Sequence, residues 1–397
     1  MTSRKACKKL LVICNTFPDV SDTYIGGIFI KDQISCLSKY FESIHVLVPA
    51  PFSIAKLRKI PLNDYTFKNV HVHFIKYFDF PPSYFYLRDF WVKRETKKVL
   101  SFIHENAIQF DLIHAHNTWR AGRIAIEIKK IFQCPVVLTE HTSNVLQAAA
   151  KREDSQFKMT WEACDAIIRV NSRDTGLFHK ANIPGDRIFV IPNGFKKDIF
   201  CPMDSTIARD RLGLPTQKKI LLSVGALLPT KGYPYMLQAL EKIIECRKDI
   251  LYCIIGSGKL QKFLEKQVSE KGLSNYVTFA GGKPHSEIPL WMNACDLFVL
   301  PSLRESFGVV QIEAMACGKP IVATRNGGSE EVIISDEHGL LVEPANPDDL
   351  AEKILAGLGR EWDQEAILAY VERFTWGNIE KQIFNVYKSV SRILKES

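Results

Sequence analysis

The fold is decided by the stretch 297–323, which reads LFVLPSLRESFGVVQIEAMACGKPIVA. Four apolar residues come first, a polar loop follows, and a segment with helical spacing leads to a second short apolar run at 321–323. Short, fully apolar strands that alternate with helices are typical of a parallel sheet covered on both faces. The stretch therefore predicts one strand–helix–strand unit of an α/β domain.

The same alternation runs through the chain in two sets. The first set of expected strands is 10–15, 44–48, 70–75, 112–115, 136–139, 166–170 and 188–191, and the second is 220–224, 251–255, 277–280, 297–300, 321–323 and 340–342. A turn signal, Pro192-Asn193-Gly194, and a polar stretch at 196–215 separate the two sets. We predict two doubly wound, Rossmann-like α/β domains facing a cleft, one at 1–195 and one at 196–376.

The composition is that of a globular protein, with 46% hydrophobic and 24% charged residues, and 397 residues suit about two domains. No apolar run reaches the roughly 18 residues that a membrane-spanning helix needs. The basic start leads into a strand-like run and not a signal peptide, so a cytoplasmic protein is expected. The ten cysteines include no CxxC pair, which indicates neither a disulfide framework nor a zinc site.

The net charge of +8 is concentrated in the N-terminal half. Residues 1–195 hold 27 Lys and Arg against 18 Asp and Glu, whereas the remainder holds 25 against 26. This asymmetry favours an anionic partner for the first domain, either a phospholipid surface or a phosphorylated acceptor. Nucleic acid is not expected as a partner, because no recognised motif or aromatic-basic ribbon accompanies the charge.

The loop after the expected strand 297–300 carries the sharpest chemical signal. Glu305 lies in this loop and Glu313 lies in the following helix, so both carboxylates could accept hydrogen bonds from hydroxyls of one extended ligand. The backbone N–H groups of Ser306, Phe307 and Gly308 lie at the start of that helix, where a diphosphate binds readily. Two glutamates at an arbitrary spacing would otherwise be ordinary surface residues.

These residues belong to a pattern that resembles the donor-site signature of the retaining glycosyltransferase family 4, which has the GT-B fold. The signature is Glu305-x7-Glu313, followed by Cys317-Gly-Lys-Pro320 and Gly327-Gly-Ser-Glu-Glu331. The resemblance runs almost end to end, in the family's order, through Gly26-Gly27, Asp111-Leu-Ile-His-Ala-His116, Glu140-His-Thr142, Ile191-Pro-Asn-Gly194, Val224-Gly225, Lys231-Gly232 and Phe374-Thr-Trp376.

The resemblance implies a role for each matching residue. Glu305 would contact the transferred sugar, Glu313 the ribose, Lys231 the diphosphate, and His141 the sugar at the reaction centre. Gly225 and the Gly26-Gly27 pair would approach the donor through their backbones. The last helix, at about 377–397, would cross back to the first domain. A lysine placed on a leaving diphosphate stabilises the transition state more than the ground state, because the diphosphate gains charge as it departs.

One position departs from the family pattern. Members often carry an arginine directly after Gly225 as a second diphosphate clamp, and this chain has Ala226 there. Arg304 or Arg325 could substitute from a neighbouring loop, and the sequence does not decide between them.

Three histidines of the first domain need separate interpretation. His141 ends an apolar strand at the predicted cleft, and the resemblance makes it the best candidate of this domain. His114 and His116 have the spacing of a metal pair, but no third ligand follows at a matching spacing, so structural or cleft-polar roles are preferred. The Gly26-Gly27 pair precedes a helix expected from about residue 29, where the backbone either approaches a ligand or forms a flexible turn.

Neither a cofactor nor a metal is predicted. The chain lacks an Asp-x-Asp motif, which metal-dependent enzymes use to hold a sugar nucleotide through a divalent cation. The resemblance implies a retaining reaction on one face of the sugar, in which the leaving phosphate assists deprotonation of the acceptor.

The segment 81–103 combines aromatic and basic residues. Tyr84, Phe85, Tyr86, Phe90 and Trp91 precede Lys93, Arg94, Lys97 and Lys98. Such a segment is either an interfacial helix that contacts an anionic membrane or a core helix with a solvated basic side.

The predicted function is transfer of a sugar from a UDP- or GDP-sugar to a hydroxyl of a glycan or lipid-linked acceptor, in polysaccharide or glycoconjugate biosynthesis. A sugar-nucleotide epimerase of the same fold and a non-catalytic partner subunit are the alternatives. A nicotinamide-dependent oxidoreductase is rejected, because Gln261 replaces the third glycine of the fingerprint that Gly256 and Gly258 would begin.

Overall fold

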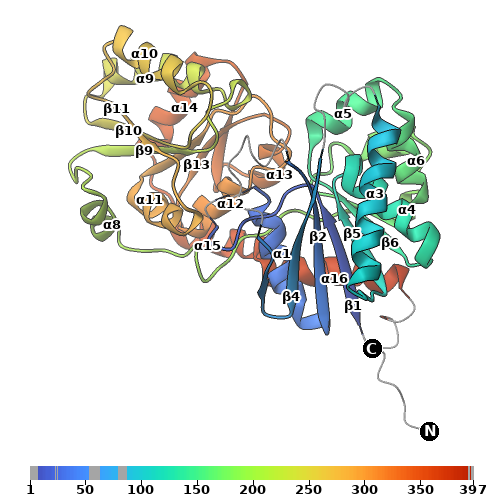
Figure 1. Ribbon diagram of the computed structural model, residues 1–397. Helices are drawn as coiled ribbons and strands as arrows, with labels where there is room; N and C mark the ends of the chain where they lie inside the picture. Colours follow the sequence, from blue (N-terminus) through green and yellow to red (C-terminus); the bar gives the residue numbers. More distant parts are fainter. Residues whose placement is uncertain are drawn as a thin grey trace. The chain divides into compact units, whose positions relative to one another are not determined.

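The computed structural model describes residues 8–22, 24, 26–52, 63–78, 87–391 and 394 (Figure 1). The chain divides into two compact units: unit 1 contains Met1–Pro192 and Trp376–Ser397, and unit 2 contains Asn193–Thr375. The first division was expected three residues later, after 195. Trp376, expected at the end of the second domain, is instead buried in a core of unit 1 with Ile379 and Ile383.

Unit 1 is built on an eight-stranded sheet with the order β3-β4-β2-β1-β5-β6-β7-β8. Its strands are β1 Lys9–Cys14, β2 Ser43–Pro51, β3 Tyr65–Phe67, β4 Val70–Tyr77, β5 Leu112–His116, β6 Val136–Glu140, β7 Ala166–Arg169 and β8 Ile188–Val190. The neighbours pair in parallel except for β3, which is antiparallel to β4. The sequence pattern did not predict β3, because three residues are too few to show a strand period.

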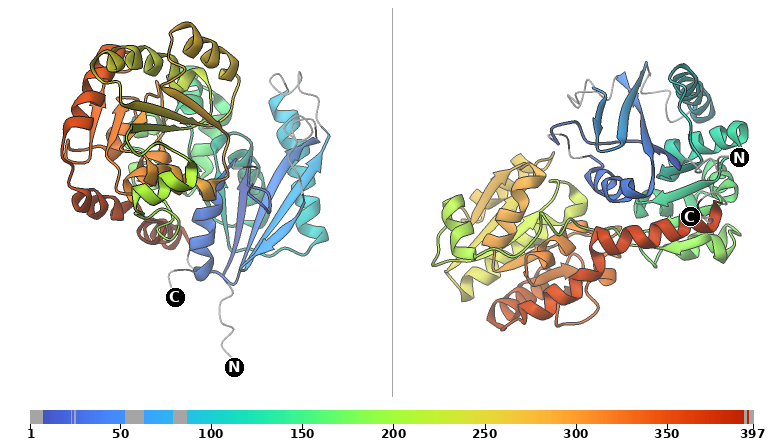
Figure 2. Two further views of the ribbon diagram at one scale, coloured as in Figure 1. Left: turned by 90° about the vertical axis from the view of Figure 1, so that its left-hand side faces the viewer. Right: turned by 90° about the horizontal axis from the view of Figure 1, so that it is seen from below.

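Helices cover both faces of this sheet (Figure 1). Leu10 and Val12 of β1 pack with the helices of one face, and Leu11 and Ile13 with those of the other, as the two-residue period of a strand requires. The first face carries α1 Ile28–Leu37 and α16 Trp376–Val390, which lie side by side (Figure 2). The second face carries α3 Arg88–Glu105, α4 Arg123–Phe132, α5 Ser143–Lys151, α6 Ser155–Ala163 and α7 Thr175–Lys180.

Unit 2 contains a six-stranded, wholly parallel sheet with the order β11-β10-β9-β12-β13-β14. Its strands are β9 Lys219–Val224, β10 Ile250–Ile255, β11 Val277–Gly281, β12 Leu297–Leu300, β13 Ile321–Thr324 and β14 Gly339–Val342. Its helices are α8 Ser205–Leu212, α9 Tyr233–Cys246, α10 Gln261–Glu270, α11 Ile288–Ala294, α12 Val309–Ala316, α13 Ser329–Val332, α14 Pro347–Gly359 and α15 Gln364–Val371.

The predicted fold class, two doubly wound α/β units, is confirmed. In each sheet the chain first winds outward in one direction and then in the other, so each sheet has one point where the strand order reverses. That point lies between β1 and β5 in unit 1 and between β9 and β12 in unit 2. Ligands of open α/β sheets bind beyond the carboxyl ends of the strands at such a switch point.

Candidate active site

Two residues predicted for the site meet at the switch point of unit 2. Lys231 ends the short turn Pro229–Lys231 after β9, and Glu305 lies in the loop after β12. Lys231 Nζ lies 2.5 Å from Glu305 Oε1, and the two side chains are 25% and 12% exposed. Because both side chains are partly exposed, this ion pair can open, and each side chain can then bind a ligand instead.

Gly232 sets how closely the two loops approach each other. Its φ is +68°, and a Cβ there would lie only 1.9 Å from the carbonyl oxygen of Pro301. The backbone N–H of Leu303 donates to the carbonyl of Thr230 at 2.8 Å, which ties the same loops together. Only glycine fits at this position, because a side chain would collide with the backbone of the next loop.

Tyr233 and Lys231, on either side of Gly232, lie close to Gly225. The Tyr233 hydroxyl donates to the Gly225 carbonyl at 3.0 Å, and a Cβ on Gly225 would lie 3.8 Å from Cε of Lys231. The lysine stem therefore passes over Gly225, and the predicted residues Gly225, Lys231 and Glu305 form one cluster.

The start of α12 has no side-chain cap. Its N-cap, Gly308, has a left-handed backbone with φ of 78°, and no side chain caps the helix. Phe307 is buried, and its backbone N–H would lie 2.7 Å from a Cβ placed on Gly328, so the loop after β13 packs directly on the loop 306–308. The predicted residues Ser306, Phe307 and Gly308 thus precede an uncapped helix, where first-turn N–H groups are available to an anion.

Glu313 lies one turn further along α12 and is engaged with a histidine that the sequence interpretation missed. His285 Nε2 lies 2.9 Å from Glu313 Oε1, and both side chains are largely buried. His285 begins a short turn, His285–Glu287, after β11, at the same edge of the sheet as the other loops. The signal that could have found it is its position in a loop that follows an apolar strand.

Ala226 stands where family members often carry an arginine, and two arginines lie in other loops of unit 2. Ala226 is exposed, as is Arg304, which precedes Glu305 in the loop after β12. Arg325 follows β13, and its Nε lies 3.3 Å from Glu343 Oε1. Arg325 thus has an exposed acidic partner, and Arg304 lies exposed next to Glu305.

The switch point of unit 1 contains a loop with an unusual backbone. Asn117 and Arg120, directly after β5, have φ of 73° and 67°, a region that costs non-glycine residues strain. Asn15, directly after β1, holds this loop: its Nδ2 donates to the Trp119 carbonyl at 2.9 Å, and its Oδ1 accepts from Ala121 N–H at 3.2 Å. The strain therefore lies at the end of the sheet where ligand sites are expected.

His141 lies beside this loop, directly after β6. Its Nε2 is 2.9 Å from Nδ1 of His116, the last residue of β5, and the two rings are nearly parallel, at 12°, with centroids 5.2 Å apart. The centroid of the Phe29 ring, in the first turn of α1, lies 4.8 Å from that of the His141 ring, and the two rings are tilted by 59°. The predicted Gly26-Gly27 pair directly precedes α1, and Gly27 packs its Cα against the Thr16 carbonyl with φ of 84°. Unit 1 therefore brings its predicted residues together.

Burial keeps His141 neutral. It is 7% exposed, and burial, together with the charges of His114 and Arg169, lowers the pKa of His141 to about 3. Burial also lowers the pKa of His114 to about 3 and that of His116 well below its usual value. At neutral pH these imidazoles can donate or accept hydrogen bonds but carry no charge.

Buried charges support the backbone around His141, and the sequence interpretation did not find most of them. The Arg169 guanidinium donates to the Glu140 carbonyl and to Asp174 Oδ2, each at 2.5 Å, and also to the Ser143 hydroxyl. Glu140 accepts from the N–H groups of Thr118 and Thr142 at 2.8 and 2.9 Å. These bonds fix the residues on both sides of His141.

Asp174 is held as a carboxylate by the same network. Burial alone would raise its pKa, but hydrogen bonds from Ser143, Arg169 and Gln147 outweigh that effect and lower it. The charges of Arg169 and Asp174 thus compensate each other inside unit 1.

His114 has a structural position. Its Nε2 lies 2.7 Å from the Thr139 hydroxyl and its Nδ1 lies 2.6 Å from the Tyr387 hydroxyl on α16. Within the described part of the chain, no group of three or more His, Cys, Asp or Glu side chains is arranged to hold a metal ion.

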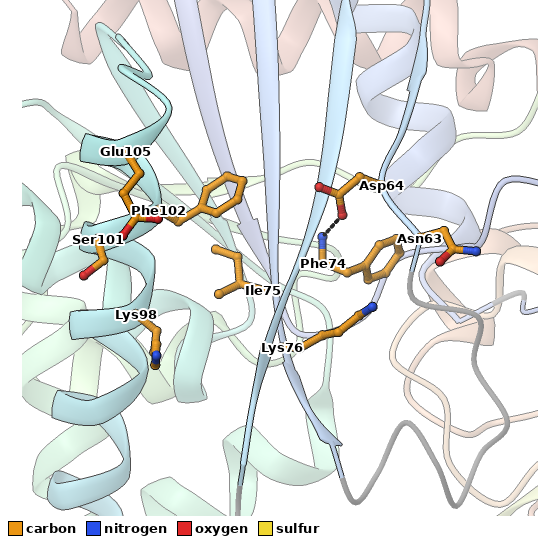
Figure 3. A pocket seen from close by; sticks show the side chains of 9 residues that line it. All are labelled: Asn63, Asp64, Phe74, Ile75, Lys76, Lys98, Ser101, Phe102 and Glu105. Atoms are coloured by element: carbon orange, nitrogen blue, oxygen red, sulfur yellow. Dashed lines mark hydrogen bonds between the residues drawn. The ribbon is translucent and has the colours of Figure 1, made fainter.

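A hollow of about 510 Å³ lies between β4 and α3 of unit 1 (Figure 3). Lys76 and Lys98 reach it from opposite sides, but Asp64 and Glu105 line it as well. Its two positive and two negative charges balance, so the hollow offers an anion no net attraction. It contains none of the residues predicted for the site.

Among the helices of the described residues, none is both long and apolar enough to cross a membrane.

Comparison with known proteins assigns the chain to a family. The profile of "Glycosyltransferase Family 4" matches residues 43–198, and that of "Glycosyl transferases group 1" matches residues 204–370. An uncharacterized glycosyltransferase of Methanocaldococcus jannaschii is 31% identical over 70% of this chain and 75% of its own length. A D-inositol 3-phosphate glycosyltransferase of Corynebacterium urealyticum is 30% identical over 76% of each chain.

Solved structures show the same fold. Sucrose-phosphate synthase of Thermosynechococcus elongatus superimposes with a TM-score of 0.77 at 21% identity, covering 96% of this chain and 98% of that one. Anabaena HepE in complex with UDP superimposes with a TM-score of 0.74 at 24% identity, covering 96% of this chain and all of that one. The structural likeness and the matching profiles agree.

Proposed function

Because the chain belongs to the family 4 glycosyltransferases of the GT-B fold, we propose that it moves a sugar from a UDP- or GDP-sugar to a hydroxyl of a glycan or lipid-linked acceptor in polysaccharide or glycoconjugate biosynthesis. The reaction retains the anomeric configuration and needs no metal. The observation that carries this proposal is the Lys231–Glu305 pair at the switch point of unit 2, beside the uncapped start of α12.

The donor binds to unit 2 through its diphosphate. Lys231 and the first N–H groups of α12 neutralise the charge that the leaving nucleoside diphosphate gains, which stabilises the transition state more than the bound sugar nucleotide. HepE, of the same fold, has been crystallised with UDP and with UDP-glucose. That likeness supports a uridine nucleotide as the first candidate.

The carboxylates of unit 2 have separate roles in the proposal. Glu305 releases Lys231 to the diphosphate and accepts hydrogen bonds from hydroxyls of the transferred sugar. Glu313, already oriented by His285 at 2.9 Å, accepts from the ribose hydroxyls. Gly225 leaves room for the diphosphate above its backbone.

The acceptor is a ligand of unit 1, where His141 contributes a neutral imidazole to the transferred sugar. A neutral imidazole suits this role. A charged imidazolium would also attract the anionic donor before the reaction, and would therefore stabilise the bound donor as well as the transition state. The leaving phosphate oxygen takes the acceptor proton as the new glycosidic bond forms on the same face of the sugar. One curated relative is named for an inositol phosphate acceptor, which keeps a phosphorylated acceptor among the candidates.

The second part of the proposal is peripheral contact with an anionic membrane at the cytoplasmic face. The exposure of the side chains on α3 limits the kind of contact that is possible. Trp91, expected as an apolar anchor, is 5% exposed and packs inward, whereas Phe90 is 52% exposed. Residues 84–86 lie outside the described part of the chain. Contact would therefore be mainly electrostatic, through the exposed Lys93, Arg94, Lys97 and Lys98.

Vesicle co-sedimentation tests that contact. The protein should sediment with vesicles rich in anionic lipid, and replacement of the four basic residues by glutamine should release it. Equal sedimentation of both proteins would remove this part of the proposal.

A thermal-shift screen tests the main proposal. UDP, GDP, ADP and their common sugar conjugates are added with magnesium or with a chelator, and one nucleotide family should raise the melting temperature equally in both. A ligand at about 100 times its Kd adds roughly 2.7 kcal/mol of stability. Lys231→Ala should lose the shift, and Lys197→Ala, which removes an exposed pair with Glu372 in the same unit, should keep it.

The identified donor is then incubated with candidate acceptors, and the anomeric configuration of the product is read by NMR. Conversion of the donor sugar without an acceptor would indicate the epimerase alternative. No shift with any nucleotide would favour a non-catalytic subunit, and dependence on magnesium would contradict the metal-free reaction.

A further inference from the structure

Glu313 of unit 2 is a nearly buried carboxylate with few hydrogen-bond donors around it. Its side chain is 7% exposed, and among the described residues only the ring of His285 bonds the carboxylate, with Nε2 at 2.9 Å from Oε1. A carboxylate offers about four sites to donors, and burial makes unused sites costly. The shortage of donors therefore indicates that a ligand supplies the remaining ones.

The two oxygens of this carboxylate differ in their surroundings. Oε1 faces His285, and because a carboxylate oxygen has no proton to give, Nε2 of His285 is the donor. Oε2 accepts from none of the described residues, yet it is not one of their fully buried polar atoms that lack a partner. Oε2 therefore reaches the surface of unit 2, where a ligand hydroxyl can donate to it.

The position of His285 is itself fixed by its surroundings. It begins the turn His285–Glu287 after β11, the edge strand of the sheet of unit 2. The buried ring of Phe200 lies with its centroid 5.2 Å from that of the His285 ring, and the His285 side chain is only 16% exposed. The imidazole therefore has little freedom to turn, and it can hold the carboxylate that it bonds in one orientation.

The place of Glu313 along α12 suits a nucleotide. Glu313 is five residues beyond Gly308, the N-cap of the helix, which corresponds to about 7.5 Å along the helix axis at roughly 1.5 Å per residue. The proposed function places the diphosphate at that helix start. A ribose, which is joined directly to the diphosphate, can lie beside the turn that carries Glu313.

We propose that His285 is a positioning residue that makes unit 2 select nucleotides with ribose hydroxyls. It donates Nε2–H to Oε1 of Glu313, and the fixed carboxylate then presents Oε2 to those hydroxyls. This rests on the proposed function, in which Glu313 accepts from the ribose, and it assigns the selectivity for the hydroxyls to His285. Without this donor the carboxylate would gain rotational freedom and lose the bond that compensates part of its burial.

A pair of ligands measures this selectivity. UDP and dideoxy-UDP, which lacks both ribose hydroxyls, are titrated calorimetrically into the same protein, and the ratio of their dissociation constants is compared between variants. The unaltered protein should bind UDP roughly 10- to 100-fold more tightly than dideoxy-UDP, the scale of a hydrogen bond to a charged acceptor. If the thermal-shift screen identifies another base, the ribose and dideoxy forms of that nucleotide take their place.

Two substitutions of His285 separate its hydrogen bond from its bulk. His285→Gln keeps an N–H donor near the place of Nε2, whereas His285→Leu fills the space without one. The leucine variant should lower the ratio of the dissociation constants by roughly tenfold, and the glutamine variant should keep most of it. Because both ligands are titrated into the same protein, a partial loss of stability affects both titrations alike and leaves their ratio interpretable.

The matched control is His338→Leu, which removes the other histidine of unit 2. His338 is buried and its ring stacks on that of Tyr370 at 3.8 Å, so this variant should lose stability and keep the ratio of the unaltered protein.

The same ratio in His285→Leu as in the unaltered protein would overturn the inference, and so would equal losses in the leucine and glutamine variants. If no nucleotide binds to the unaltered protein, the donor proposal itself fails and the inference fails with it. Nucleotide binding with an unchanged ratio in His285→Leu removes only the role of His285, so the two failures remain distinguishable.

Discussion

The switch-point sites of the two units use charged side chains in opposite ways. In unit 2, Lys231 and Glu305 pair with each other in partly exposed loops and remain available to a ligand. In unit 1, Arg169 and Asp174 are almost fully buried and stabilise the backbone on either side of a neutral His141. The difference teaches that a charge near a site acts on the ligand or on the scaffold according to its burial and partners.

The largest effect is expected in the scaffold of unit 1. Arg169→Leu removes the partner of a buried carboxylate, and an uncompensated buried charge costs about 3–5 kcal/mol. The melting temperature of unit 1 should therefore fall strongly in calorimetry. Lys158→Leu is the matched control, because its pair with Glu162 is half exposed and the melting temperature should barely change. Similar melting temperatures for both variants would contradict a structural role for Arg169.

A smaller effect is expected where glycine sets the geometry of unit 2. Gly232→Ala and Gly213→Ala both place alanine at a positive φ, of 68° and 65°, so both include a backbone cost of roughly 1–2 kcal/mol. Only the first also meets a carbonyl oxygen at 1.9 Å, because nothing lies within 4 Å of a Cβ on Gly213. Chemical denaturation should show the greater loss for Gly232→Ala, together with a weaker nucleotide-induced thermal shift. Equal losses would mean that the loops move apart easily.

The sequence predicted the fold from the apolar runs, because strands buried on both faces leave a strong pattern. It did not predict β3, which is short and lies at the sheet edge, and it left open whether Trp91 belongs to an interfacial or a core helix, whereas the structure shows that the residue packs inward. For the site, the motifs named Lys231, Glu305, Glu313 and His141, whose functional roles remain predictions. Arg169 and His285 were not found, since Arg169 acts on the distant Glu140 carbonyl and His285 on the distant Glu313; only His285 left a signal, its position in a loop after an apolar strand.

The third prediction concerns the rate of sugar transfer. It separates charges that act on the ligand from charges that stabilise the protein. Lys231→Ala and Glu305→Ala should each lower the rate of transfer by at least about tenfold, the scale of one lost transition-state contact. Because the pair is partly exposed, their melting temperatures should stay close to that of the unaltered protein. Initial-rate assays with the identified donor measure the first effect. Near-normal transfer in both variants would contradict the placement of the donor at this pair.

The last effect is expected from mild acid, and it should be seen in unit 1. Burial, together with the charges of His71, His73 and Lys9, lowers the pKa of His45 to about 4 from its usual 6.5. The unfolded chain therefore takes up this proton before the folded protein does, and stability that is complete above about pH 6.5 is lost as the pH falls toward 4. The melting temperature should decline over this window, and His45→Leu should make the decline shallower because one of the contributing histidines is gone. A decline of unchanged slope in that variant would show that His45 gains its proton as easily in the folded protein as in the unfolded chain.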